Sequence, residues 1–346
     1  MGFLAGKKLL ITGLLSNRSI AYGVAKACHA QGAELAFSYV GERFKARICE
    51  FAAEFDSTLV FDCDVGSDEQ IDQMFKDLSV HWPTFDGFVH SIGFAPREAI
   101  SGDFLEGLSR EAFKIAHDIS AYSFPGMAKA AKPYLNDKAA LLTLTYLGAV
   151  RTIPHYNTMG LAKASLEASV RYLAANLGRK GIRVNGIAPG VVDTPMWATV
   201  DALFAKYEGL AIGEKKRAVG KAVPMGRMGR PDDYRGAAVF LASPEAGWLT
   251  GQIVLAGGAR PLVPKIPGLD GVDFLTSDSV WELRVLPRRL VVLGGGPIGS
   301  KFLSNGTSYS PTITWSTYGR LESRSASEAQ CGPHKTTFLP RNLTCR

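Results

Sequence analysis

LLITGLLSNRSIAYG, residues 9–23, contains the first strand, the first turn and the start of the first helix of this chain. An apolar strand ends at a turn with Gly13, and from Ser19 the apolar residues follow the three-to-four-residue spacing of a helix. The segment AELAFSYV, residues 33–40, then predicts a second strand. Strand, helix and strand in this order predict a βαβ unit whose strands run parallel.

The same alternation continues to residue 258. It predicts strands at residues 58–65, 85–93, 139–148, 182–190 and 250–258, and helices around residues 42–54, 67–80, 109–131 and 155–177 and from Pro231. Because the strands are apolar and alternate with helices, they predict one Rossmann-like, doubly wound α/β sheet of about seven parallel strands with helices on both faces. Ligands of such sheets bind at the carboxyl ends of the strands, where the strand order reverses.

The composition of the chain changes near residue 258. We expect residues 1–258 to form the Rossmann-fold domain, with a substrate lid at about residues 192–230, and residues 259–346 to be an appended tail. From Ser304 onward the tail is rich in Ser, Thr, Gly and Pro. This composition predicts partial or complete disorder rather than an independent domain.

The tail contains Gly294, Gly296 and Gly299 in the G-x-G-x-x-G spacing of dinucleotide-binding loops. An apolar run, residues 290–293, precedes them and predicts a strand. No amphipathic helix is expected after them to offer a phosphate its N-terminus, and no second strand with a ribose-binding acid is expected to return. We therefore expect the cofactor at the N-terminal loop instead.

Charge, hydropathy and ligand spacing exclude several functions. The net charge is +7, but residues 256–346 hold eleven Lys and Arg against six Asp and Glu, whereas residues 1–255 hold 28 against 26. Residues 1–255 contain no basic stripe interleaved with aromatic residues, so we expect no nucleic-acid partner. Every apolar run is shorter than the ~20 residues of a membrane helix and no cleavable signal is evident, so we expect a cytoplasmic protein without a membrane partner. The five Cys and six His lack zinc-site spacing, so we expect no metal.

The N-terminal loop is the expected site of the cofactor pyrophosphate. Only Gly13 and Gly23 represent a glycine-rich loop there, so an ordinary strand-to-helix turn is the competing interpretation. A tight turn and the free N–H groups of a helix start can still bind a pyrophosphate, and Ser19, beside Ile20, adds a hydroxyl donor.

Two later strand ends favour the cofactor interpretation. Asp64 and Val65 end the third strand, where a carboxylate can accept a hydrogen bond from the adenine amino group. Ile92 and Gly93 end the fourth strand, where a glycine lets the backbone approach the cofactor closely. Together they make a dinucleotide the better interpretation of the first loop.

The residues after the second strand leave the choice of dinucleotide open. No acidic residue stands directly at the end of this strand. Glu42 suits the ribose of NADH, whereas Arg43 and Lys45 suit the 2′-phosphate of NADPH. We expect NADH, with NADPH as the alternative.

Tyr146 ends the fifth strand, and Tyr156 and Lys163 stand seven positions apart in the next helix. Seven residues make about two turns, so the two side chains share a face. A lysine there can hold the nicotinamide ribose and favour a tyrosine that donates a proton or stabilises an oxyanion. Because this helix opens beside the proposed cofactor crevice, we prefer this interpretation to a core tyrosine and a solvated lysine.

These residues lie in stretches that resemble a known family. The chain resembles the short-chain dehydrogenase/reductase superfamily, and residues 1 to about 188 resemble the bacterial enoyl-acyl-carrier-protein reductases. The matching stretches are MGFLAGKKLLITG, SIAYGVAKA, FDGFVHSIGFAP, FKIAHDISAYSF, LLTLTYLGA and YNTMGLAKASLEASVRYLAANLG. They cover a little over half of the chain, and the two tyrosines and the lysine of the family fall on Tyr146, Tyr156 and Lys163.

The resemblance implies that NADH delivers a hydride to the β-carbon of a trans-2-enoyl thioester of acyl carrier protein or coenzyme A. Tyr156 would donate to the thioester oxygen as enolate charge develops, Lys163 would hold the ribose and Tyr146 would assist at the substrate. A homotetramer is implied as well. The implied cofactor contacts are Gly13, Ser19, Ile20, Asp64, Val65, Ile92, Gly93, Lys163, Val192 and Thr194, and the implied substrate contacts are Ala95, Tyr146, Tyr156 and Met159.

Two later segments resemble other families. Residues 188–255 resemble a sorbitol-type polyol dehydrogenase of the same superfamily, although PGVVDT, residues 189–194, still suits contact with the nicotinamide carboxamide. Residues 256–300 resemble a fragment of a flavin- and NAD-dependent disulfide reductase, without the C-x-x-x-x-C redox pair of that family. A lid of another type predicts weaker binding of long acyl chains and of diphenyl-ether inhibitors.

Three functions therefore compete. The first is an enoyl reductase of fatty-acid synthesis, the second is an NAD(P)H-dependent carbonyl or polyol reductase, and the third is a chimeric scaffold with little activity. Carbonyl-reducing relatives usually have a serine thirteen residues before the catalytic tyrosine. Thr143 occupies this position and Tyr146 follows three residues later, which favours the enoyl reductase.

Overall fold

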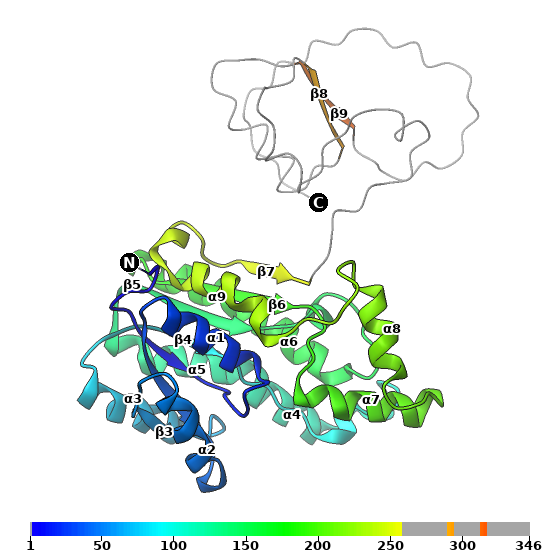
Figure 1. Cartoon of the computed structure of the whole chain (residues 1–346), viewed down its shortest axis with the longest axis horizontal. Helices are drawn as coiled ribbons and strands as arrows, with labels where there is room; N and C mark the ends of the chain where they lie inside the picture. The colour runs from blue at the N-terminus through cyan, green and yellow to red at the C-terminus, as the bar shows by residue number, and fades with distance from the viewer. Residues whose placement is uncertain (1, 258–288, 294–311, 317–346) are drawn as a thin grey trace. The chain divides into compact units, whose positions relative to one another are not determined.

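A computed structural model describes residues 2–257, 289–293 and 312–316. The chain forms two units, Met1–Arg260 and Pro261–Arg346, and each is described by itself. The first unit contains a seven-stranded parallel sheet in the order β3-β2-β1-β4-β5-β6-β7 (Figure 1). The strands are β1 (Lys8–Ile11), β2 (Glu34–Tyr39), β3 (Val60–Asp62), β4 (Phe85–His90), β5 (Leu135–Leu144), β6 (Arg183–Pro189) and β7 (Ile253–Ala256). This order confirms the predicted Rossmann-like fold and places the reversal of strand order between β1 and β4.

Helices cover both faces of the sheet. On one face α1 and α2 pack against β1, β2 and β3, and α9 packs against β5 and β6. On the other face α3 packs against β3, α5 against β5 and α6 against β6. The helices are α1 (Ile20–Ala30), α2 (Glu42–Ala53), α3 (Asp68–His81), α4 (Arg110–His117), α5 (Ser123–Ala131), α6 (Asn157–Leu177), α7 (Pro195–Glu208), α8 (Glu214–Ala222) and α9 (Arg235–Ala242). Strands buried on both faces therefore explain the near-continuous apolar runs in the sequence.

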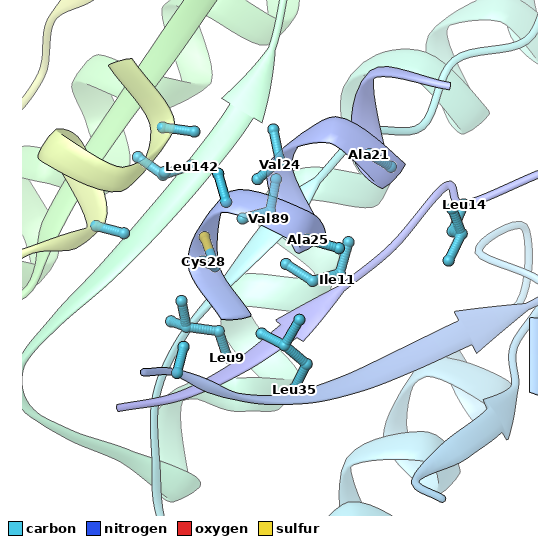
Figure 2. Close-up of a cluster of buried hydrophobic side chains, with 14 of the residues drawn as sticks. Leu9, Ile11, Leu14, Ala21, Val24, Ala25, Cys28, Leu35, Val89 and Leu142 are labelled. Carbon is cyan, nitrogen blue, oxygen red and sulfur yellow. The ribbon is translucent and has the colours of Figure 1, made fainter. Parts of the chain in front are cut away.

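The packing of α1 follows from the first residues of the sheet. Leu9 and Ile11 of β1 and Leu35 of β2 pack with Val24 and Cys28 of α1, and all five side chains are buried (Figure 2). Val24 and Cys28 are one helical turn apart, so both meet the sheet on the same face of α1. Burying each large aliphatic side chain contributes roughly 1.5–3 kcal/mol, which holds the start of α1 over the end of β1.

The helical segment expected at residues 109–131 has one wide turn. A π-helix, Asp118–Tyr122, joins α4 to α5. Within it the Ser120 hydroxyl accepts from the N–H of Phe94 and donates to the C=O of Phe94, both at 2.8 Å. Single π turns in α-helices are frequent at functional sites, and this one fixes the loop that follows β4.

The segment expected to form the lid, residues 192–230, contains α7 and α8 (Figure 1). Pro195 is the first residue of α7, where its fixed φ suits a helix start, and Gly213 precedes α8 with a φ of 83°. The buried Asp201 carboxylate of α7 accepts from the N–H of Gly213 and, at 3.3 Å, from the N–H of Lys216. One carboxylate thus joins the two lid helices.

The second unit has two strands among its described residues. β8 (Arg289–Leu293) and β9 (Thr312–Ser316) pair in parallel, with Arg289 opposite Thr312. The sequence of β9, TITWS, is rich in β-branched and aromatic residues that favour a strand. Neither strand contains Asp or Glu. The glycine motif at residues 294–299 and the expected disorder of the tail lie outside the described residues.

Candidate active site

The ends of β1 and β4 meet where the strand order reverses. Thr12 follows β1, is fully buried, and its hydroxyl donates to the C=O of Val89 in β4 at 3.1 Å. Gly13 has a φ of +76°, and a Cβ at this position would clash with the carbonyl oxygen of Ser91. Glycine therefore lets the loop after β1 lie directly against the end of β4.

Ser19 organises the start of α1. Its hydroxyl donates to the C=O of Ser16 at 2.7 Å and accepts from the N–H of Tyr22 at 3.3 Å, which makes it the N-cap. This hydroxyl, expected as a phosphate donor, is thus already engaged within the loop. The N–H groups at the very start of α1, beginning with Ile20, precede the first intrahelical hydrogen bond, and together with the helix dipole they could receive an anion.

Asp64 and Val65 lie directly after β3. Val65 is buried, whereas Asp64 is exposed and its carboxylate accepts from the N–H of Gly66 at 2.9 Å. The N–H of Asp64 donates to the side-chain oxygen of Gln70 at 2.8 Å. These two hydrogen bonds hold a carboxylate at the carboxyl edge of the sheet.

An acid from another part of the sequence lies against the end of β2. It is Asp62, the last residue of β3, whose carboxylate accepts from the N–H of Gly41 at 3.0 Å. Of the three charged residues expected to select the cofactor, Glu42 and Lys45 pair with each other at 3.1 Å, and the third is Arg43. Because β3 pairs with β2 in the sheet, Asp62 from the end of β3 lies beside the end of β2, where a ribose-binding acid is expected.

Ile92 and Gly93 bring the loop after β4 to α6. A Cβ on Gly93 would lie 3.5 Å from the Nζ of Lys163, and Ile92 packs against the core below α3 and α5. The next residue, Phe94, is the one that Ser120 holds from the π-helix. The loop after β4, Lys163 and the π-helix therefore form one side of the crevice.

Tyr146 and Tyr156 are in edge-to-face contact. Their ring centroids lie 4.8 Å apart and the ring planes meet at 61°. Gly148 lies against them, since a Cβ there would clash with the ring of Tyr156. His155 and Asn157, on either side of Tyr156, have φ values of 60° and 37°. Non-glycine residues in this conformation are uncommon and concentrate at functional sites.

Burial controls the protonation of the lysine and the two tyrosines. Lys163 is 7% exposed, and its Nζ donates to the C=O of Leu144 at 2.9 Å. Burial lowers the pKa of Lys163 to about 8, and the charge of Glu167 opposes this change. Burial raises the pKa of Tyr156 far above its ordinary value, and it also raises the pKa of Tyr146. Near neutral pH Lys163 is therefore largely cationic, and Tyr156 is a neutral phenol that can donate a hydrogen bond.

An apolar wall lies beside Tyr156. Met159, one turn into α6, is buried with Ala116 and Ala162, and Ala95 from the loop after β4 packs against this cluster. Two residues expected to contact substrate, Ala95 and Met159, are thus part of one surface. Such an apolar surface next to a single donor suits an aliphatic chain that ends in a carbonyl group.

Val192 and Thr194 stand where the chain leaves β6 for the lid. Val192 is buried, and Thr194 immediately precedes α7. Asp193 between them pairs with Arg18 of the first loop at 3.0 Å and with Lys216 of α8 at 2.8 Å. No local sequence pattern predicts this contact, because its members are far apart along the chain.

His90 engages the threonine that distinguishes the competing functions. The Ser123 hydroxyl donates to the C=O of Ile119 at 2.7 Å, so it accepts from the Nε2–H of His90 at 2.8 Å. The Nδ1 of His90 then accepts from the Thr143 hydroxyl at 3.0 Å. Burial and the cation of Lys163 lower the pKa of His90 to about 3, so its ring is neutral. Thr143 is fully buried and bonded to His90, so its hydroxyl is not available to a substrate.

The cysteines of the domain are not at the site. Burial raises the pKa of the Cys28 and Cys63 thiols to about 12, so neither is a reactive thiolate. Within residues 2–257 and the strands β8 and β9, no group of His, Cys, Asp and Glu could hold a metal ion. In the same parts of the chain, no helix has the length and apolar character needed to cross a membrane.

Two sequence families match this chain. Residues 13–258 match the family described as "Enoyl-(Acyl carrier protein) reductase". This match continues across residues 188–255, the segment that resembles a polyol dehydrogenase. Residues 234–309 match the family described as "Pyridine nucleotide-disulphide oxidoreductase".

Individual proteins give the same result as the first family. The enoyl-[acyl-carrier-protein] reductase [NADH] FabI of Neisseria meningitidis serogroup B is 52% identical over 259 residues, which are 75% of this chain and 96% of that protein. A crystal structure of the enoyl-[acyl-carrier-protein] reductase (NADH) of Aquifex aeolicus is 40% identical, with a TM-score of 0.68 over 75% of this chain and 98% of that one. The reductase of Anaplasma phagocytophilum in complex with NAD is 35% identical, with a TM-score of 0.66 over 80% and 96%.

The family match covers more than half of the chain, and it includes Gly13, the end of β4, both tyrosines and the lysine described above. The relative from Neisseria meningitidis is matched over nearly its whole length. This chain belongs to the enoyl-(acyl carrier protein) reductase family.

Proposed function

We propose that this protein reduces trans-2-enoyl thioesters of acyl carrier protein or coenzyme A with NADH, as a step of fatty-acid synthesis. The observation that carries the proposal is the pair Tyr156 and Lys163, a neutral and partly buried phenol and a buried cation, beside the crevice between β1 and β4. Membership of the family and the names of the matched relatives support the substrate class.

The crevice fits a dinucleotide. Gly13 leaves out the Cβ that would fill the gap beside Ser91, and the start of α1 can receive a pyrophosphate. The pairing of Lys45 with Glu42 and the carboxylate of Asp62 beside β2 favour NADH over the 2′-phosphate of NADPH. The residues proposed to contact the dinucleotide are Gly13, Ser19, Ile20, Asp64, Val65, Ile92, Gly93, Lys163, Val192 and Thr194.

The dinucleotide, when bound, supplies the hydride, and the residues of the chain orient the reactants. Tyr156 donates a hydrogen bond to the thioester oxygen, where negative charge grows during the reaction. Lys163 holds the ribose hydroxyls with a cationic donor. Tyr146 packs against Tyr156 and limits its orientation, and Ala95 and Met159 contact the acyl chain.

The second candidate is a polyol or carbonyl reductase. It is supported by the resemblance of residues 188–255 to a sorbitol-type dehydrogenase, a lid we infer to be divergent from that of an enoyl reductase. The engagement of the Thr143 hydroxyl by His90 argues against it, because carbonyl-reducing relatives usually have a serine at this position that serves the substrate. The third candidate, a chimeric scaffold, predicts dinucleotide binding without turnover.

We further propose that residues 1–258 are the catalytic domain and that residues 259–346 are an addition to it. The match of residues 234–309 to a disulphide oxidoreductase supports a fragment of such a protein at residues 256–300. That stretch contains no cysteine, so it has no redox pair of its own.

A homotetramer is proposed for the assembly. Its support is the exposed apolar surface of the helices after β4 and β5, where Phe113, Tyr122 and Tyr172 are 38%, 45% and 80% exposed. A groove of about 630 Å³ beside Tyr122 lies between α4, α5 and α6. Light scattering of the purified full chain tests this state, and a monomeric mass would refute it.

One assay tests the proposed reaction. Purified full-length protein is mixed with NADH and crotonyl thioesters of coenzyme A and of acyl carrier protein, and the loss of NADH absorbance is followed. Parallel reactions contain NADPH, and others contain NAD with sorbitol or NADH with fructose. Turnover with the enoyl thioesters alone supports the proposal. Binding of NADH without turnover of any enoyl thioester would refute it.

A further inference from the structure

Two side chains of α6, one turn apart, hold two consecutive residues at the end of β5. The Nζ of Lys163 donates to the C=O of Leu144 at 2.9 Å. The Glu167 carboxylate accepts from the hydroxyl of Thr145 at 2.8 Å. Tyr146 is the next residue along the chain, so these two hydrogen bonds fix the backbone that presents it to the site.

The second of these hydrogen bonds is removed from solvent. Thr145 is 5% exposed and Glu167 is 8% exposed. The N–H of Thr145 also donates to the C=O of Ile187 in β6 at 2.9 Å, so this residue is held from the sheet and from α6 together. A buried carboxylate is costly unless its hydrogen bonds are made, and a fold that needed only packing would place an apolar side chain here.

We propose that Glu167 is a positioning residue, which acts through Thr145 on the placement of Tyr146 and through its charge on the cation of Lys163. The inference rests on the proposed function, since it assigns Lys163 to the cofactor and Tyr146 to the substrate. Glu167 itself touches neither, and it acts on the residues that do.

The charged neighbours of Lys163 single out Glu167. Among the described residues, Glu167 is the acid that raises the pKa of Lys163 against the effect of burial. His90, from β4, is neutral because burial lowers its pKa to about 3. Tyr156 and Tyr146 are neutral because burial raises their pKa values. Without the charge of Glu167, Lys163 would lose its proton at a lower pH.

The test uses three variants of the full chain, Glu167→Gln, Thr145→Val and Thr145→Ser, with the exposed Glu50→Gln of α2 as the control. The dissociation constant of NADH is measured by fluorescence from pH 6 to pH 10, without any substrate. Glu167→Gln keeps a hydrogen-bond acceptor and removes the charge. It is expected to move the alkaline loss of NADH affinity to lower pH by about one unit, and Glu50→Gln to leave it in place.

Steady-state kinetics with a crotonyl thioester give the second measurement. Thr145→Val removes the hydroxyl that Glu167 holds, and it is expected to lower kcat by about tenfold at neutral pH through misplacement of Tyr146. Thr145→Ser retains the hydroxyl and should restore most of the rate. A merely structural role would not distinguish Ser from Val in kcat when both variants have native circular dichroism.

Each outcome decides the proposal. An unshifted pH profile of NADH affinity in Glu167→Gln overturns it, and so does an equal kcat for Thr145→Val and Thr145→Ser. If Glu167→Gln does not fold, the two Thr145 variants decide alone. If the wild type binds NADH but reduces no enoyl thioester, the proposed function fails. A shifted profile in Glu167→Gln would then still support the action of Glu167 on Lys163.

Discussion

Two regions of the site are built from different kinds of contact. The first, which we call the floor, consists of the buried side chains that hold the end of β5, and the second is the predicted lid, residues 192–230. In the floor, Lys163 and Glu167 are less than a tenth exposed and bond to the end of β5. In the lid, Asp193 pairs with Arg18 and Lys216, whose side chains are 56% and 41% exposed. Removing one partner of a buried hydrogen bond leaves the other unsatisfied, whereas exposed ion pairs contribute about 0–1 kcal/mol. The chemistry should therefore depend on the floor far more than on the lid.

The largest effect is expected for Tyr156→Phe. The substitution removes the hydroxyl that is proposed to stabilise the growing negative charge, and it leaves the ring that packs on Tyr146. We expect kcat with a crotonyl thioester to fall by about a thousandfold, while the dissociation constant of NADH stays within about twofold. Single-turnover kinetics and NADH fluorescence measure the two values. A rate near that of the wild type would remove Tyr156 from the mechanism.

A second strong effect is expected for Gly13→Ala. The added Cβ would clash with the carbonyl of Ser91, and alanine would adopt a φ of +76° that strains its backbone. The ends of β1 and β4 must then separate, so we expect a loss of about 3 kcal/mol in the free energy of unfolding. Urea denaturation measures it. Gly209→Ala, at a φ of +67° in open space between the lid helices, is the matched control and should cost about 1 kcal/mol.

The substitution Lys163→Met should weaken NADH binding and yet raise the free energy of unfolding at pH 7. It should weaken NADH binding by about fiftyfold, because the cationic donor to the ribose is lost. Burial lowers the pKa of Lys163 from 10.5 to about 8, so the folded state holds this proton less well than the unfolded state. The buried charge therefore lowers the free energy of unfolding by its full cost below about pH 8. The free energy of unfolding then rises as the pH rises toward 10.5.

The same variant should accordingly be more stable than the wild type at pH 7, by about 2 kcal/mol after the lost hydrogen bond to Leu144 is subtracted. Denaturation at pH 7 and at pH 10.5 checks the sign. The advantage should shrink at the higher pH, and an advantage that grows with pH would contradict the assignment of the shift to Lys163.

The smallest effect is expected in the lid. Asp193→Asn removes the charge that pairs with Arg18 and Lys216 but keeps the shape of the side chain. We expect the KM for a long-chain enoyl thioester to rise by about threefold, with kcat unchanged, and the difference to disappear at high salt because exposed pairs are screened. Glu214→Gln, on the exposed part of α8, is the control. A tenfold fall in kcat would mean that the lid belongs to the catalytic machinery as much as the floor does.

The sequence predicts the sheet and the positions of Tyr156 and Lys163 better than it predicts the hydrogen bonds between different elements of the site. Alternation of apolar strands and helices suffices for the sheet, and the spacing of Tyr156 and Lys163 suffices to place them on one helix face. The hydrogen bonds from Glu167 to Thr145 and from His90 to Thr143 join different elements, and no local pattern encodes such pairs. Asp62 was missed for the same reason, because the acid at the end of β2 comes from β3.

Two features show how local patterns and folded contacts differ. The Ser19 hydroxyl, proposed to contact the cofactor, also caps α1, since an N-cap is the common position of serine before a helix. The segment TITWS stands inside the region rich in Ser, Thr, Gly and Pro for which partial or complete disorder was expected, and it forms the strand β9. The contact with β8 stabilises it there, and such non-local pairing outweighs local composition.

The two hydrogen bonds between Ser120 and Phe94 have a consequence for the rigidity of the crevice. One hydroxyl takes the place of a neighbouring strand, because it pairs with both the N–H and the C=O of the same residue. The amide hydrogen of Phe94 should then exchange with deuterium slowly, like that of a strand, although the residue lies in a loop. The side of the crevice formed by the loop after β4 is thus held like part of the sheet itself.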